Sequence, residues 1–396
     1  MQRPLIYRCR TDAGQMQDRC RLNTRRSAAS INRRQVSRHC RFMLSFASLN
    51  PQRVLMKTRS FLCHEIADSI DGLTLVDMTL ADPAPGEVQI EIKACAVNFP
   101  DILMIQGRYQ FKPPMPFAPG GEFSGVVSKV GPDVIHLKVG DRVVAGTRFG
   151  GFSEHANVPV ESVRVLPEHV SFAKAASYAT AYLTAYVALK VRGQLAASET
   201  LLVHGAAGGV GMAAADLGQY FGARVIATAG TDEKLRVLDE RGVDGVINYT
   251  QADGSLGGFR ETVKALTDGN GADVIFDPVG GSVFDESMRC INWGGRLLSI
   301  GFTSGVWPKA AVNHILIKQI SVIGVRAGEI GRRDPALGQA CRDAVFELLC
   351  NGHIDPYIHR TYPLEDGIAA MTSLQSRAVI GKAVLTMNGY EAGSTA

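Results

Sequence analysis

The chain has 396 residues, of which 46% are hydrophobic and 20% charged, a composition typical of a folded globular protein with a sizeable core. Residues 1–55 hold twelve Arg, no Lys and two acidic side chains, giving +10, whereas residues 56–396 hold 30 basic and 36 acidic side chains, giving −6. The main part of the chain is therefore acidic, which argues against nucleic acid or a membrane surface as a partner. No stretch contains the roughly 20 apolar residues of a membrane-spanning helix.

The first 55 residues have the composition of a leader. They are rich in Arg, contain Ser and are poor in acidic residues, which is typical of a mitochondrial transit peptide, and they lack the apolar segment of a secretory signal. A mis-assigned start is the alternative, since Met56 begins "MKTRSFLCHEI", which resembles the natural start of a domain. We expect residues 1–55 to be disordered and the protein to be cytoplasmic, with the mitochondrial matrix as the alternative if the leader is a targeting sequence. Eight scattered cysteines without a CxxC pair favour a reducing compartment.

Short strands joined by Gly and Pro turns are predicted for residues 56–181. The alternation in "EVQIEIKACAV" (87–97) predicts one strand, and "VGDRVVAG" predicts another after a turn at Gly140 and Asp141. From residue 182 the pattern becomes a regular β-α-β alternation, with short, mostly apolar strands in "TLLVHGA", "RVIATAG", "ADVIFDPVG" and "GRLLSIGF". Uniformly apolar strands are expected in a parallel sheet covered by helices on both faces. The fold class is therefore α/β, with mixed elements returning after residue 323.

The segment "LLVHGAAGGVG" combines an apolar strand, a glycine turn and the start of a helix, which is the placement of a dinucleotide-binding loop. Its spacing is Ala206-x-Gly208-x-x-Gly211, with alanine at the first glycine position. Gly208 lets the backbone approach a pyrophosphate, and Gly211 lets the helix pack closely on the strand. The alternative is a structural turn. The predicted cofactor contacts in this loop are Ala206, Gly208, Gly209, Val210 and Gly211.

The end of the second strand of this unit indicates which nicotinamide cofactor is bound. An acidic residue there would bind the ribose hydroxyls of NAD, but the strand ends at Gly230 and Thr231, with Lys234 close behind. A lysine near this position favours the 2′-phosphate of NADPH. Two alternatives remain open: Lys234 is an ordinary solvated lysine, or Asp232 serves as the ribose partner.

Several motifs together resemble the quinone oxidoreductase branch of the medium-chain dehydrogenase/reductase superfamily. They are "ACAVNFPDILMIQGRY" (94–109), "PFAPGGEFSGVV" (116–127), "VGDRV" (139–143), "HGAAGGVG" (204–211) and "DGVINY" (244–249). The resemblance extends from residue 56 to about residue 388. It implies a GroES-like, partly open β-barrel catalytic domain formed by 56–181 and 324–396, interrupted by a Rossmann NADPH-binding domain at 182–323.

The resemblance also bears on zinc. The zinc alcohol dehydrogenases of this superfamily carry a ligand Cys at the position matching Asn98, and Gly-His-Glu where this chain has Gly120, Gly121 and Glu122. The four-cysteine structural zinc lobe is absent as well, and Cys95 is expected to be a buried structural thiol. Without zinc no Lewis acid polarises an alcohol, so reduction of an electrophilic quinone or enone is favoured.

Site residues carried over from the family fall into three groups. Asn98, Asp101 and Tyr109 match residues near the acceptor, although Asn98 and Asp101 are also compatible with a turn and a helix cap, and Tyr109 with packing. Lys234, Tyr249 and Arg377 match a set that binds the 2′-phosphate. Residues expected beside the nicotinamide are Thr184, Gly301 and Phe302. Outside these groups, His204 is expected to pack or to bond backbone, and Trp293 and Trp307 to be packing residues.

The resulting hypothesis is an NADPH-dependent, zinc-independent reductase of quinones, with a small-molecule partner and a homodimeric or homotetrameric assembly. The alternative is an NADPH-dependent reductase of an enone, alkenal or enoyl-CoA thioester, and a non-catalytic, crystallin-like or RNA-binding protein is the third hypothesis. A CoA substrate requires a basic entrance. The −6 charge of residues 56–396 does not favour one, although a local patch would escape this count.

Overall fold

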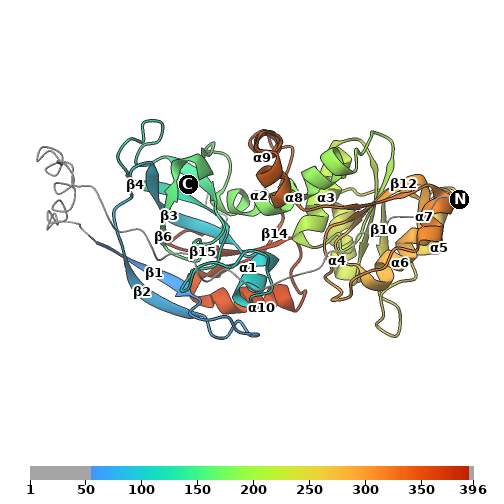
Figure 1. The fold of residues 1–396 in the computed structure, drawn as a ribbon, viewed down its shortest axis with the longest axis horizontal. Coiled ribbons are helices and arrows are strands. Elements are labelled where there is room, and N and C mark those ends of the chain that lie inside the picture. Colours follow the sequence, from blue (N-terminus) through green and yellow to red (C-terminus); the bar gives the residue numbers. More distant parts are fainter. Residues whose placement is uncertain (1–54, 392–396) are drawn as a thin grey trace, which may run out of the picture. The chain divides into compact units, whose positions relative to one another are not determined.

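The computed structural model describes residues 55–391 (Figure 1). The predictions for the leader therefore lie outside the described residues, except at residue 55. Among the described residues, two larger sheets and one antiparallel pair, β1 (Met56–Leu62) with β2 (Thr74–Leu80), contain the named strands.

The first larger sheet joins the beginning and the end of the described chain. Its order is β14-β15-β3-β4-β5-β7, with β6 also paired to β3. The strands are β3 (Glu87–Ala96), β4 (Glu122–Val130), β5 (Arg142–Gly146), β6 (His155–Pro159), β7 (Val163–Val165), β14 (Ile358–Pro363) and β15 (Lys382–Thr386). Strand β15 runs antiparallel to β3, with Val384 opposite Ala96, so the C-terminal segment completes a sheet that the N-terminal segment begins. The strand predicted at 87–97 and the turn at Gly140, with its φ of +95°, are both confirmed.

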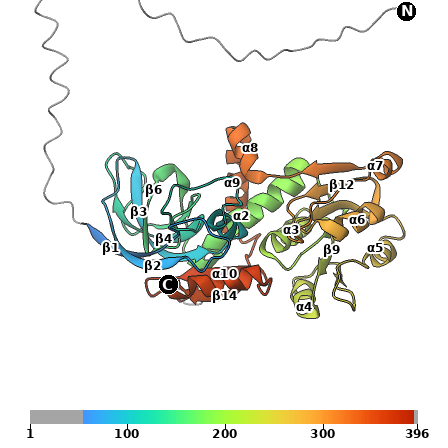
Figure 2. The same ribbon diagram turned by 60° about the horizontal axis from the view of Figure 1, so that its bottom comes forward.

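Two short helices flank this sheet, α1 (Phe99–Ile105) after β3 and α10 (Gly367–Gln375) before β15. Figure 2 shows α10 beside β14. The core beneath contains fully buried Phe123 and Phe152 and the buried thiol of Cys95, whose predicted burial is confirmed. Burial raises the pKa of Cys95 well above its ordinary value, which keeps this thiol protonated.

The second larger sheet has the order β10-β9-β8-β11-β12-β13, and every neighbouring pair in it is parallel. This is the doubly wound Rossmann order, in which the strand order reverses between β8 and β11. The strands are β8 (Thr200–Val203), β9 (Arg224–Ala229), β10 (Gly245–Asn248), β11 (Ala272–Asp277), β12 (Ile291–Ser299) and β13 (Ser321–Gly324). The predicted α/β class is thereby confirmed.

Helices cover both faces of this sheet (Figure 1). Leu201 and Val203 pack into one core with α3 (Gly209–Tyr220) and α4 (Asp232–Glu240). Leu202, which points the opposite way, packs into another core with α5 (Arg260–Leu266) and α6 (Gly281–Cys290). Both faces of a parallel strand are therefore buried, which explains its uniformly apolar sequence.

The remaining helices lie on and between the two sheets. They are α2 (Phe172–Tyr186), which continues as a π-helical segment at Val187–Arg192, α7 (Val312–Lys318), α8 (Ala327–Arg333) and α9 (Pro335–Cys350), with short 3-10 turns at Val160–Ser162 and Leu364–Asp366. Helix α2 contacts strands β3, β4 and β5 of the first sheet and helix α3, which covers the parallel sheet, so it connects the two larger sheets. Within residues 55–391, no helix combines the length and apolar character needed to cross a membrane.

Both tryptophans depart from their predicted packing role. The exposed fraction is 66% for Trp293 and 80% for Trp307. The prediction was wrong because aromatic character indicates that burial is favourable but does not place a residue on a covered face. Trp293 lies where Gly294 turns the chain, and Trp307 lies in the loop after β12, at 6.5 Å from the ring of Phe302.

Candidate functional site

The glycine loop between β8 and α3 is shaped by two glycines with different tasks. Gly205 has a φ of +56°, so the tight turn occurs one residue before the alanine that replaces the first glycine of the predicted spacing. A Cβ on Gly211 would lie 2.3 Å from the carbonyl oxygen of Gly205 and 2.8 Å from the Cα of Ala206. The helix therefore approaches the turn so closely that position 211 admits no side chain.

The start of α3 presents backbone N–H groups that the helix itself does not use. Met212 donates to the Gly208 carbonyl at 2.8 Å, and the first N–H groups of a helix have no partner within it. Gly209, Val210 and Gly211 are thus available to an anion at the positive end of the helix. The N–H groups of Ala206 and Gly208 are engaged by the carbonyls of Thr228 and Gly205, so these two residues shape the loop by packing. This arrangement fits a pyrophosphate cradle.

A buried lysine that the sequence did not indicate runs past this loop. Gly381 donates its N–H to the Ala207 carbonyl at 2.7 Å, which brings the start of β15 against the loop. A Cβ on Gly209 would lie 2.9 Å from the Cδ of Lys382. The stem of Lys382 therefore forms one side of the cradle, and its ammonium group extends toward the first sheet.

The ammonium group ends in a buried polar network at the cap of α1. Lys382 Nζ donates to Glu122 Oε1 at 2.9 Å and to Asn98 Oδ1 at 2.6 Å, and Asn98 Nδ2 donates to Glu122 Oε1 at 2.9 Å. Glu122 Oε2 accepts the N–H of Thr180 at 2.7 Å. The side chains of Lys382 and Glu122 are 6% and 2% exposed. Every charge in the network is paired, as burial requires.

Asp101 holds the start of α1. One of its carboxylate oxygens accepts the N–H of Asn98 at 2.8 Å, and the other accepts the N–H of Gly120 at 3.1 Å. Burial raises its pKa to about 7, and the two backbone hydrogen bonds act in the opposite direction. These contacts of Asp101 are those expected of a helix cap. The role of Asp101 at the acceptor stays a prediction.

A cavity of about 340 Å³ opens beside this network. Asn98, Asp101 and Tyr109 all line it, so three of the predicted residues meet in one space. Phe111 and Thr180 contribute further walls. Its size and its mixture of aromatic and polar walls suit a small planar molecule.

The three residues predicted for a 2′-phosphate lie close together although they come from distant segments. Lys234 Nζ donates to the backbone carbonyl of Arg377 at 2.6 Å. Burial and then the charge of Arg377 lower the pKa of Lys234. Burial raises the pKa of Tyr249, against the opposing effect of the Arg377 charge and a hydrogen bond from the Gly205 backbone. Lys234 and Arg377 are thus two cations beside the glycine loop, and within the described chain no ion pair is found for either of them. An anion bound between them would stabilise their positive charges.

Asp232, the alternative ribose partner near the end of β9, is hydrogen-bonded to another side chain. Asp232 Oδ1 accepts a hydrogen bond from Asn248 Nδ2 at 2.8 Å. Thr231 caps α4, with its hydroxyl accepting the N–H of Lys234 at 3.4 Å. At neighbouring Gly230, a Cβ would lie 3.1 Å from the hydroxyl of Thr250. This strand end is thus small and uncharged, as predicted for an NADPH enzyme.

The residues predicted beside the nicotinamide occupy two places. The Thr184 hydroxyl donates to the Thr180 carbonyl of its own helix at 2.8 Å, which puts Thr184 one turn from the cavity wall. Gly301 and Phe302 follow β12, and Arg377 donates to the carbonyl of Thr303 in the same loop. The roles of Thr184, Gly301 and Phe302 beside the nicotinamide remain predictions.

His204, just before the loop, is fully buried. Its ring nitrogens lie 2.9 Å from the Thr228 hydroxyl and 2.8 Å from the Ser287 hydroxyl. The partners of His204 are therefore side chains, whereas the sequence predicted packing or bonds to the backbone. Its packing role is confirmed by a ring contact with Phe259 at 4.7 Å. Burial lowers the pKa of His204 to about 3.

The pKa of His204 predicts a component of acid instability. The pKa of an unfolded histidine is about 6.5. Between this pH and about 3, the unfolded chain therefore binds a proton at His204 that the folded chain does not bind. This component is intact above about pH 6.5 and lowers the free energy of unfolding by up to about 1.4 kcal/mol per pH unit below it. Asp101 and Asp277, whose pKa values are raised to about 7 and about 6, act in the opposite sense.

The His204→Leu variant isolates this component, because the Thr228 and Ser287 hydroxyls keep carbonyl partners. Denaturant unfolding between pH 4 and pH 8 is expected to give a shallower acid decline for His204→Leu than for the wild type. The exposed His136→Leu serves as the control and should follow the wild-type curve. Parallel curves for wild type and His204→Leu would contradict the assignment.

Within residues 55–391, no group of three or more His, Cys, Asp or Glu side chains is placed to hold a metal ion. The positions at which zinc alcohol dehydrogenases carry ligands hold Asn98, which is bonded to Glu122 and Lys382, and Gly121. Independence of zinc remains a prediction from this donor set.

Family models match two parts of the chain. The model described as "Alcohol dehydrogenase GroES-like domain" matches residues 84–168, and the model described as "Zinc-binding dehydrogenase" matches residues 209–340. Their order agrees with the two larger sheets described above.

Relatives match over most of the chain. The quinone oxidoreductase-like protein 2 homolog of Nematostella vectensis is 37% identical over 332 residues, which cover 83% of this chain and 88% of that protein. Quinone oxidoreductase 1 of Escherichia coli K12 is 35% identical over 320 residues, covering 79% and 95%. Among solved structures, Escherichia coli quinone oxidoreductase complexed with NADPH aligns with a TM-score of 0.73 at 32% identity, covering 83% of this chain and all of that one.

Proposed function

Because the chain belongs to the quinone oxidoreductase branch of the medium-chain dehydrogenase/reductase superfamily, we propose that it is an NADPH-dependent, zinc-independent reductase of quinones. The balanced reaction converts NADPH, a quinone and one proton into NADP⁺ and a hydroquinone. The observation that carries the proposal is the convergence of Lys234, Arg377 and Tyr249 beside the glycine loop. The relative whose structure contains NADPH supports this choice of cofactor.

NADPH, when bound, supplies the hydride for this reduction. The free N–H groups of Gly209, Val210 and Gly211 bind the pyrophosphate, and Lys234 and Arg377 bind the 2′-phosphate. The cavity beside α1 holds the quinone ring against Tyr109. Tyr109 Oη donates the proton that completes the hydroquinone. Asn98 is held by Lys382 and Glu122, so its amide has a fixed orientation at the cavity wall.

Removal of the phosphate-binding cations is expected to change cofactor preference. Lys234→Ala and Arg377→Asn should each raise the dissociation constant of NADPH by about tenfold or more, the cost of losing a hydrogen bond to a charged group. Asn suits position 377 because the backbone there has a φ of +58°. The affinity for NADH should stay unchanged, as measured by titration of nicotinamide fluorescence. Arg236→Gln is the matched control, since Arg236 lies on the same helix as Lys234 but is 71% exposed and pairs with Glu240. Equal loss of both cofactors would contradict the assignment.

Steady-state oxidation of NADPH by the purified protein tests the function. A small para- or ortho-quinone should be reduced rapidly with NADPH, poorly with NADH, and at an unchanged rate after treatment with a chelator. An alkenal tested in parallel examines the enone alternative. Turnover of the alkenal without turnover of any quinone would replace the proposed function by that alternative.

We also propose a homodimeric or homotetrameric assembly and a cytoplasmic location. Strand β13 lies at the edge of the parallel sheet, and Val312, Leu316 and Ile317 of the neighbouring helix α7 are each more than two-thirds exposed. An unpaired edge beside apolar side chains favours pairing with a second copy. Sedimentation analysis tests the assembly.

The cytoplasmic location is supported by the cysteines. The five cysteines within residues 55–391 are free, which supports a reducing compartment. Cell fractionation tests the cytoplasm against the mitochondrial matrix.

A further inference from the structure

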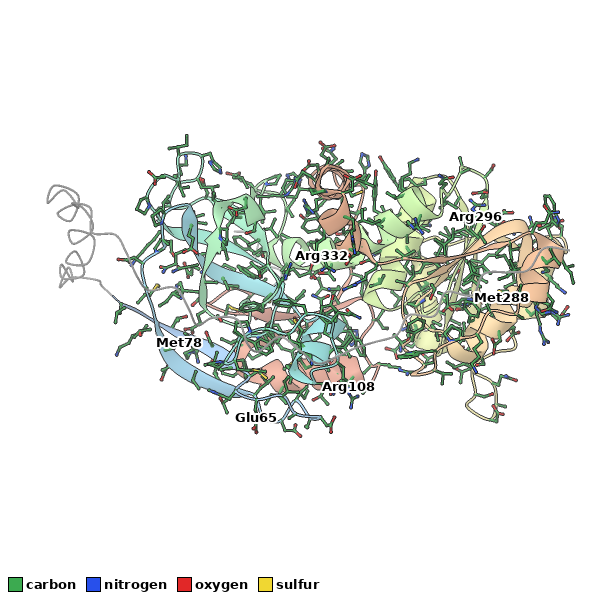
Figure 3. All side chains as sticks on the ribbon, viewed as in Figure 1. Glu65, Met78, Arg108, Met288, Arg296 and Arg332 are labelled. Carbon is green, nitrogen blue, oxygen red and sulfur yellow. The ribbon has the colours of Figure 1, made fainter. Side chains whose placement is uncertain are left out.

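The cavity beside α1 carries three guanidinium groups that no site prediction included. Arg148 comes from the loop after β5, Arg326 immediately precedes α8, and Arg332 lies on α8, where Figure 3 labels it. Among the described residues that line this cavity, Asp101 is the single acidic side chain, and both its oxygens accept backbone N–H groups. The cavity therefore has an excess of positive charge.

The charges of these arginines are not balanced locally. Arg326, Arg332 and Arg333 share the carboxylate of Glu329, with separations of 3.4 Å for Arg326 and 3.0 Å for Arg333. Arg148 stacks on the ring of Phe111 at 4.6 Å, and within the described part of the chain no ion pair with a carboxylate is found for it. Three guanidinium groups on one carboxylate, and a fourth on an aromatic ring, leave N–H donors open to an anion.

We propose that the acceptor of this enzyme carries a negatively charged group, a carboxylate or a phosphate, outside its reducible part. Arg148, Arg326 and Arg332 bind that group, while Tyr109 and Phe111 contact the reducible part. The proposal rests on the proposed function, because it names the acceptor of that same cavity. Paired guanidinium N–H groups match the two oxygens of a carboxylate or phosphate, which gives both affinity and orientation.

A second cavity adjoins the first, and it would be reached by a long acceptor but not by a compact one. It has a volume of about 500 Å³ and shares the walls Gly121, Thr147 and Thr180 with the first. Arg342 lines it and donates to Gln339 Oε1 at 3.2 Å and 2.7 Å. A compact carboxylate would reach the first cavity alone, whereas an extended phosphate-bearing thioester would also reach Arg342.

The test compares charged and neutral acceptors that have the same reactive part. One pair is a naphthoquinone with a propionate side chain and its methyl ester, and the other is crotonyl-CoA and crotonyl-N-acetylcysteamine. Arg326→Gln and Arg332→Gln are each expected to raise KM about tenfold for the charged member of at least one pair, with kcat unchanged and the neutral member unaffected. Added salt should weaken the wild-type preference in parallel. Arg333→Gln is the matched control, because Arg333 also pairs with Glu329 but does not line the cavity.

Each outcome has a defined meaning. A KM effect for the propionate quinone that Arg342→Gln does not reproduce supports a compact carboxylate, whereas an effect for crotonyl-CoA that Arg342→Gln does reproduce supports a phosphate-bearing tail. Equal effects on charged and neutral acceptors, effects no larger than those of Arg333→Gln, or a weakened NADPH affinity in the variants would overturn the proposal. Failure of the wild type to reduce any quinone, charged or neutral, would refute the proposed function instead.

Discussion

The Gly211→Ala variant is expected to bind NADPH at least a hundredfold more weakly than the wild type. The added methyl group would lie 2.3 Å from the Gly205 carbonyl oxygen and 2.8 Å from the Cα of Ala206. Both are backbone atoms of the turn, so relief of the clash requires helix α3 to move away from the loop. Overpacking of this kind costs about 1–3 kcal/mol in stability, and the displaced N–H groups lose their common direction. Equilibrium titration of nicotinamide fluorescence measures the affinity, and thermal unfolding of the free protein measures the stability.

Two other glycines make this experiment specific. Gly208→Ala adds a methyl group whose nearest neighbour, the Gly205 carbonyl oxygen, is 3.4 Å away, so the free protein should unfold like the wild type. Its NADPH affinity should nevertheless fall, because the methyl group occupies the approach of the pyrophosphate. Gly72→Ala, with no atom within 4 Å of the new Cβ, should change neither property. Wild-type affinity in Gly211→Ala would disprove the cradle.

Removal of the ammonium group in Lys382→Met is expected to destabilise the protein by about 3–5 kcal/mol, because it leaves Glu122 buried without its cation. Glu122→Leu should cost a similar amount by leaving the ammonium unpaired. The double variant should lose less than the sum of the two single variants, because neither charge then remains buried. Denaturant unfolding at neutral pH measures all three free energies.

The pair of Lys129 and Asp82 provides the control for this cycle. It has an N–O distance of 2.7 Å, comparable to the 2.9 Å of the buried pair, but its side chains are 36% and 44% exposed. Lys129→Met should therefore cost no more than about 1 kcal/mol. A loss in Lys382→Met as small as the loss in Lys129→Met would show that water screens the inner pair, and would contradict its burial in the structure.

Local sequence predicted the elements around the cofactor well because their determinants lie within a few residues. The apolar strand β8, the glycine turn and the start of α3 follow each other without interruption, and each has a short-range physical signature. The alternation in β3 likewise reflects the two sides of one strand. The convergence of Lys234, Tyr249 and Arg377 was different, since it was expected from family resemblance and not from any pattern in their spacing.

Contacts between distant segments escaped prediction where the family resemblance did not imply them. Lys382 and Glu122 are 260 residues apart, and nothing near either of them indicates that they meet in the interior. The arginines of the cavity were missed for another reason. A net charge of −6 for residues 56–396 sums the whole surface, whereas Arg148, Arg326 and Arg332 act together because the fold gathers them in one place.

The late position of β15 in the chain has a consequence for synthesis. A growing chain that has emerged as far as β13 possesses all six strands of the parallel sheet and the complete glycine loop. It still lacks Arg377 and Lys382, so one cation of the phosphate site and the buried partner of Glu122 arrive after everything else. An unfinished chain on the ribosome can therefore form its nucleotide-binding sheet while carrying an unpaired inner carboxylate. We expect the site to become competent only when translation has passed residue 386.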